Sequence, residues 1–148
     1  MPDHDLDAFF ARHIPLTQAM GVRLDRYDDA GLALRAPLAP NTNDKGTAFA
    51  GALASIITLS GWSLTHLTLL DAGEHAQVVI AHSELDYLRP VSGDIVAVCA
   101  RPAADAVAAF VDAFRRKGRA RWELEAVIHA AEAPAVRLRG RYVAWRAA

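Results

Sequence analysis

The sequence predicts an α+β fold in which a curled, predominantly antiparallel sheet wraps around one long central helix. Two observations lead to this prediction. Residues 48–70 are apolar on almost every side of a helix, and a helix that is apolar all round must be enclosed by protein. The segments before and after it alternate apolar and polar residues, as strands with one buried face do. A sheet that curls around the helix buries both apolar surfaces.

The remaining elements follow from local patterns. The first helix is amphipathic, and a turn at 28–31 joins the first two strands as a hairpin. Asp105 is predicted to cap the last helix, Gly118 to end it, and residues 132–134 to separate the final strands. The predicted elements are, in chain order, a helix over 3–13, strands over 21–27 and 32–36, a polar loop over 41–47, the central helix over 48–70, strands over 77–88 and 94–101, a helix over 105–117, and strands over 120–130 and 136–145.

The strand predicted over 77–88 alternates without interruption. Period-two alternation assigns its residues to two faces. One face holds Val79, Ala81, Ser83, Leu85 and Tyr87; the other holds Val78, Ile80, His82, Glu84, Asp86 and Leu88. The polar middle of the second face is predicted to meet solvent or an interface.

Length and composition bound the class of protein. The 148 residues suit a single domain over 1–148, and 53% hydrophobic side chains supply a core. A net charge of −1 argues against a general nucleic-acid binder. The lone Cys99 excludes an internal disulfide and, with an acidic N-terminus that lacks an export signal, predicts a cytoplasmic protein. No metal site or membrane span is expected, because the histidines lack ligand spacing and the long helix contains His66 and several hydroxyls.

Several short strings occur in an order that resembles the hotdog-fold thioesterases, over nearly the whole chain. These strings are Ile14-Pro15-Leu16 leading to Met20-Gly21-Val22, the polar loop from Asn41 to Gly51, and Leu88-Arg89-Pro90 followed by Gly93-Asp94. More narrowly, Asn-Asp-Lys-Gly-Thr within the loop, Gly51 and the later Ser60-Gly61-Trp62 resemble the thioesterase domain found at the C-terminus of YiiD-type proteins.

The resemblance implies a hotdog fold and an acyl thioesterase. Such an enzyme hydrolyses an acyl-CoA or acyl-carrier-protein thioester to a free carboxylic acid and a thiol, with coenzyme A present only as part of the substrate. The resemblance also implies a homodimer through strand 77–88, alone or paired again into a tetramer. The charge and the composition of the long helix argue against nucleic-acid and membrane partners. Many relatives have His-Gly-Gly at the start of the helix and a carboxylate about nine positions later. This chain has Phe49-Ala50-Gly51 and Thr58 there, which favours the alternative of a non-catalytic acyl-CoA-binding or assembly module.

Thioester hydrolysis needs donors for the developing oxyanion and a group that activates water. Amides at a helix N-terminus are unpaired donors, and Gly51 lets a carbonyl approach them, with Phe49 and Ala50 as substrate-binding neighbours. The alternative for Gly51 is tight packing alone. Asp44 is the only carboxylate in the loop and the candidate general base, with Asn43 orienting water or the carbonyl. Both residues would otherwise form an Asx turn or a cap.

Four further positions complete the predicted site. Thr58 is a candidate catalytic residue that holds water within the helix, and Ser60 is a candidate substrate-binding residue. Both hydroxyls would otherwise donate to the helix carbonyls. Ser83 is expected to bind substrate from strand 77–88, and Arg89 to bind a coenzyme A phosphate.

Overall fold

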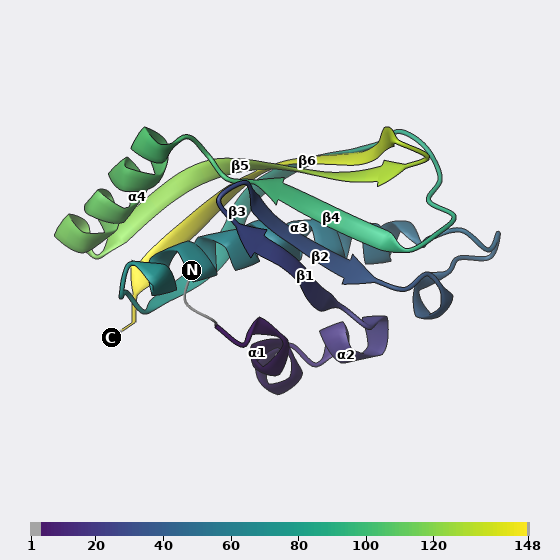
Figure 1. The fold of residues 1–148 in the computed structure, drawn as a ribbon, viewed down its shortest axis with the longest axis horizontal. Coiled ribbons are helices and arrows are strands. Elements are labelled where there is room, and N and C mark those ends of the chain that lie inside the picture. The colour runs from purple at the N-terminus through teal and green to yellow at the C-terminus, as the bar shows by residue number, and fades with distance from the viewer. Residues whose placement is uncertain (1–3, 148) are drawn as a thin grey trace.

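The fold is a six-stranded antiparallel sheet wrapped around one long helix, α3 (Figure 1). The computed structural model describes residues 4–147. The sheet order is β1-β2-β4-β5-β6-β3, and α3 packs against the strands from β2 to β6. The predicted fold class is therefore confirmed. The elements are α1 (Leu6–His13), α2 (Leu16–Met20), β1 (Arg23–Asp28), β2 (Gly31–Ala36), a 3-10 turn (Ala39–Asn41), α3 (Ala50–Asp71), β3 (Ala76–Tyr87), β4 (Ile95–Ala100), α4 (Ala104–Lys117), β5 (Arg119–Ala130) and β6 (Ala133–Arg146).

Helix α3 forms the centre of the core, as its apolar sequence requires. By length and composition α3 would also suit a membrane span, but 61% of its most apolar window is buried inside the protein, as in a core helix. Three of its buried hydroxyls donate to carbonyls of the helix itself, whereas the buried Ser63 Oγ has no hydrogen-bond partner among the described residues. Ser60 donates to Ile57 O at 2.6 Å, Thr65 to Gly61 O at 2.8 Å and Thr68 to Leu64 O at 2.6 Å.

Helix α3 approaches the sheet closely at Gly61. A Cβ atom at this position would overlap the hydroxyl and ring of Tyr142 on β6. The Tyr142 hydroxyl in turn donates to Thr58 O at 2.6 Å, and burial raises the pKa of this phenol above its ordinary value. Glycine is therefore required for contact between the helix backbone and the tyrosine ring.

A β-bulge corrects the predicted faces of β3. The pairing of β3 with β6 shifts register between Ile80 and His82, and one inserted residue moves the following side chains to the opposite face. Val78, which is 8% exposed, and Ile80 therefore share the helix-facing side with Ser83, Leu85 and Tyr87. Val79, 44% exposed, lies on the outer face with His82, Glu84 and Asp86. The prediction of unbroken alternation was wrong, because the alternation of residue types in the sequence does not reveal a bulge.

Other predicted boundaries need smaller corrections. The first strand begins at Arg23, because Gly21 instead ends the unpredicted helix α2 with φ 75°. Ala103 is the N-cap of α4, and Asp105 accepts a hydrogen bond from Ala106 N within the first turn. The predicted break at 132–134 is only partly right, because Ala133 and Pro134 already belong to β6. The turn lies at Ala131 and Glu132, whose φ values of 52° and 65° suit a tight two-residue hairpin. The predicted helix start at Asp3 lies outside the described residues.

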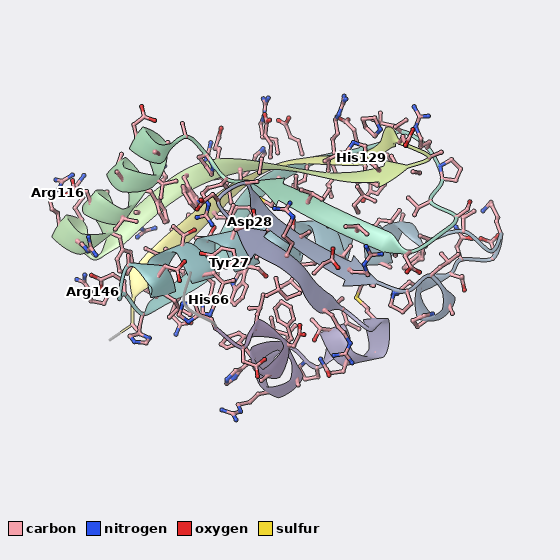
Figure 2. All side chains as sticks on the ribbon, in the orientation of Figure 1. Tyr27, Asp28, His66, Arg116, His129 and Arg146 are labelled. Atoms are coloured by element: carbon pink, nitrogen blue, oxygen red, sulfur yellow. The ribbon has the colours of Figure 1, made fainter. Side chains whose placement is uncertain are left out.

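Helix α1 closes over the C-terminal half of α3. Leu6 and Phe10 are buried in the core, while Phe9 contacts the rings of both Trp62 and His66. Burial, together with the nearby His4 and His75 charges, lowers the pKa of His66 to about 4. His66 is therefore a neutral ring at ordinary pH. Figure 2 shows His66 and Tyr27 toward the same end of α3, where Tyr27 donates to Asp71 at 2.5 Å.

The contact between Gly61 and Tyr142 predicts the effect of one added methyl group. We expect Gly61→Ala to lower the free energy of unfolding by about 1–3 kcal/mol, because the ring must move out of a filled core. Gly93→Ala is the matched control, since a Cβ there meets nothing within 4 Å. Chemical denaturation of both variants checks this expectation. Equal stability of the two would contradict the close approach.

Candidate functional site

The loop before α3 is fixed by Asn41, a buried polar residue. Its side-chain Nδ2 donates to Met20 O at 2.9 Å and to Pro37 O at 2.8 Å. Its backbone carbonyl accepts from Phe49 N at 2.7 Å, which ties the first residue of the loop to the residue before the helix. A second tie joins Ala48 N to Val91 O at 2.8 Å. The start of α3 is therefore held from both sides.

Asn43 organises the exposed part of the same loop. Its Oδ1 accepts from Lys45 N at 2.8 Å and from Thr47 N at 3.2 Å. Its Nδ2 donates to Thr47 Oγ1 at 2.8 Å and to Ala48 O at 3.4 Å. The amide is thus fully engaged within the loop, which supports a positioning role. A direct role in orienting water or substrate would require these bonds to open.

Asp44 lies at the tip of the loop. Its side chain is 82% exposed, and its carboxylate pairs with Lys45 Nζ at 3.1 Å. A carboxylate in this position is accessible to solvent and to a second molecule. Its action as a general base stays a prediction, because a base must reach the water whose proton it accepts.

The first turn of α3 offers free backbone donors. Phe49 is the N-cap residue, with extended backbone and no side-chain capping bond. Its carbonyl accepts from Ala52 N and Leu53 N, both at 3.0 Å. Within the described residues, the amides of Ala50 and Gly51 donate to no protein acceptor. They lie at the positive end of the helix dipole, so together they can stabilise an oxyanion.

Gly51 also has a packing role that the sequence analysis left as the alternative. A Cβ atom there would overlap the ring of Phe49. The glycine lets this ring fold over the start of the helix, where 56% of Phe49 stays exposed. Packing and access to the amide are compatible, because the ring fills the space that a Cβ atom would take, while the Gly51 N–H donates to no acceptor among the described residues.

Thr58 differs from most hydroxyl residues of α3. Ser55 donates to Gly51 O at 2.8 Å and the buried Ser60 donates to Ile57 O, so both hydroxyls are occupied. The half-buried Thr58 has no side-chain hydrogen bond within residues 4–147. Its hydroxyl is therefore available to a water molecule or a ligand, whereas that of Ser60 is turned to the helix backbone.

The accessible residues of α3 form one stripe on the side of β3. Gly51, Ser55, Thr58 and Trp62 recur at intervals of three or four and share a face of the helix. The Trp62 indole donates to Val78 O of β3 at 2.9 Å. This bond places the middle of α3 beside the start of β3, and the Ala48–Val91 bond places the residue before α3 beside the segment after β3. Helix α3 and strand β3 therefore run antiparallel.

Two predicted substrate-binding residues lie on or beside β3. Ser83 is exposed on the helix-facing side, and Arg89 follows the strand, where its Nε donates to Pro134 O at 2.9 Å. The structure therefore brings Gly51 and Thr58 onto one stripe, with Ser83 on the strand beside it. Asn43 and Asp44 lie in the loop before that stripe, and Ser60 lies outside it.

Sequence reasoning missed three residues that shape this region. Asn41 was predicted only as part of a polar loop, because nothing in the sequence indicates that its side chain is buried. Tyr142 could have been found, because alternation in β6 places it inward and Gly61 marks a close approach on the helix. Trp62 was noticed only as part of a motif. Within the described chain, no group of three His, Cys, Asp or Glu side chains could hold a metal ion.

Comparison with known proteins places this geometry in a family. Residues 3–146 match the family described as "Putative thioesterase (yiiD_Cterm)". Because the match covers nearly the whole chain, the protein belongs to this family of hotdog-fold thioesterase-type proteins.

Solved structures show the same architecture. A protein of unknown function from Chlorobaculum tepidum TLS is 35% identical, with a TM-score of 0.91 over 96% of this chain and 93% of that one. A "putative thioesterase" from Shewanella oneidensis is 26% identical, with a TM-score of 0.87 over 95% of this chain and 94% of that one. A Pseudomonas aeruginosa protein described as "Probable Thioesterase" is 25% identical, with a TM-score of 0.79 over 98% of this chain and 97% of that one.

The bonds of Asn43 predict a local effect of its removal. In Asn43→Ala we expect the Lys45 and Thr47 amides to exchange hydrogen faster, because both lose their acceptor. Asp44→Ala is the neighbouring control, since it removes only an exposed ion pair with Lys45. Hydrogen exchange followed by mass spectrometry checks both variants. Unchanged exchange in Asn43→Ala would contradict the positioning role.

Proposed function

We propose that the protein is an acyl thioesterase that hydrolyses an acyl-CoA or acyl-carrier-protein thioester to a carboxylic acid and a thiol. The observation that carries this proposal is the pair of unpaired amides of Ala50 and Gly51 at the start of a long buried helix. Membership of a thioesterase-type family supports the same reaction class. The proposed reaction takes place in the cytoplasm without a metal or redox cofactor.

The amides act on the thioester carbonyl. As water adds to the carbonyl carbon, negative charge develops on the carbonyl oxygen, and two fixed N–H donors stabilise it without reorganisation. The C–S bond then breaks, the acid is released, and the thiolate takes up a proton. Phe49, exposed beside these amides, offers apolar contact to the bound thioester, and Arg89 offers charge to a phosphate of coenzyme A.

The attacking water needs a group that accepts its proton. We propose Asp44 as this general base, because it is the only carboxylate in the loop before α3 and is freely accessible. The free Thr58 hydroxyl would help to hold the water. A second arrangement, with water held chiefly by Thr58, follows from the same observations and is distinguished by substitution.

The first test is hydrolysis of a panel of acyl-CoA and acyl-carrier-protein thioesters, followed by detection of the free thiol. We expect turnover of at least one acyl class. Calorimetry with the same ligands identifies the alternative, since tight binding without turnover would show an acyl-binding module. A folded protein that turns over none of these thioesters would overturn the proposed reaction.

Substitution of active protein then assigns the base. We expect Asp44→Asn to lower kcat by about 10²-fold or more, as loss of a general base does, with little change in substrate affinity. Thr58→Val keeps the side-chain shape and is expected to cost less. Wild-type rates in Asp44→Asn, together with loss of activity in Thr58→Val, would contradict Asp44 and transfer the role to the helix hydroxyl.

We further propose that the functional unit is a homodimer formed through β3, alone or paired again into a tetramer. The free edge of this 12-residue strand exposes backbone donors and acceptors that a second copy can satisfy. Ser83 and Tyr87 face the helix side yet are exposed, and Tyr87 is 51% exposed. A partner placed against this edge would cover them.

Light scattering at micromolar concentration tests the dimer, and we expect twice the mass of the chain or a multiple of it. Hydrogen exchange locates the contact, with amides of β3 protected as in an internal strand. A stable monomer, or a dimer whose β3 amides exchange freely, would contradict pairing through this edge.

A further inference from the structure

Trp62 interrupts the accessible stripe of α3 with a large side chain. The residues before it on the stripe are Gly51, Ser55 and Thr58, all small. The Trp62 indole reaches across from the helix to the edge strand and donates to Val78 O at 2.9 Å. It therefore forms a wall between α3 and β3 at this level.

The ring of Trp62 is held in place from behind. It stacks on His66 with ring centroids 4.7 Å apart and planes 17° apart, and Phe9 lies 5.5 Å away. Because burial lowers the pKa of His66 to about 4, the stack is between neutral rings over the ordinary pH range. The hydrogen bond to Val78 and this stack prevent the indole from turning aside.

The distance from the free amides to this wall is set by the helix. Gly51 and Trp62 are separated by three turns, or about 16 Å at 1.5 Å per residue. Across from this stretch, the helix-facing residues of β3 are Ile80, Ser83, Leu85 and Tyr87. The apolar members among them are only partly buried, so they can contact an alkyl chain.

We propose that Trp62 limits the length of the acyl chain that the protein accepts. A thioester whose carbonyl oxygen binds the Gly51 amide can extend its acyl chain along Ser55 and Thr58, beside Leu85 of β3, until it meets the indole. The inference rests on the proposed thioesterase function and adds a specificity-determining residue to it. Chains that fit before the wall are substrates, and longer chains must displace a ring that is held on two sides.

Three variants test the wall. Using kcat/KM over saturated acyl-CoA thioesters from acetyl to palmitoyl, we expect Trp62→Leu to move the upper limit to longer chains by at least one step of the panel. The first excluded chain should gain about tenfold relative to the wild-type optimum, the contribution of roughly two buried methylenes. Trp62→Phe keeps a ring and should retain the limit. Trp145→Leu is the matched control, a change at a 37% exposed tryptophan at the end of β6.

A substitution that adds a large side chain to the stripe tests the same path without disturbing the core. Ser55 is exposed on the stripe, so Ser55→Phe should shorten the limit while leaving the thermal melting temperature close to that of the wild type. If Trp62→Leu fails to fold, this variant alone decides the question. An unchanged chain-length profile in Ser55→Phe, or in folded Trp62→Leu, would overturn the inference while wild-type activity upholds the thioesterase. A wild-type protein without activity would overturn both.

Discussion

The whole structure depends on burying a helix that is apolar on every side. Such a helix cannot rest on a sheet with one face only, so the sheet must curl around it and other elements must cover the remainder. Strands from β2 to β6 contact α3, and α1 closes its C-terminal half with Phe9 and Phe10. The curvature of the sheet and the position of α1 are two consequences of one requirement.

Polar groups of this buried helix are tied to the sheet at several points. Trp122 of β5 donates to Thr65 Oγ1 at 2.9 Å, and Tyr142 of β6 donates to Thr58 O at 2.6 Å. These contacts come from strands that are neighbours in the sheet, so they fix the rotation of α3 about its axis. That rotation decides which residues face β3. The hydrogen bonds from Trp122 and Tyr142 therefore keep the Thr58 hydroxyl and Trp62 on the accessible side of the helix.

Much of the architecture could be predicted from periodic patterns of apolar and polar residues in the sequence. An uninterrupted apolar segment predicted α3, and alternation predicted the six strands, because helix and strand periods reflect burial directly. The faces of β3 could not be predicted, since the bulge between Ile80 and His82 depends on pairing with β6. The loop residues show the same limit. Asn43 was predicted to orient water or the carbonyl, or otherwise to form an Asx turn, and its bond from Lys45 N is that of an Asx turn. Its other three bonds depend on the exact path of the chain up to Ala48.

The central claim is that the first turn of α3 binds the thioester carbonyl. The direct measurement is a crystal structure with a non-hydrolysable acyl-CoA analogue in which a methylene replaces the thioester sulfur. The account predicts the ketone oxygen within hydrogen-bonding distance of Gly51 N, about 2.7–3.2 Å, with the alkyl chain directed toward Trp62. An analogue bound with its carbonyl away from the start of α3 would contradict the account.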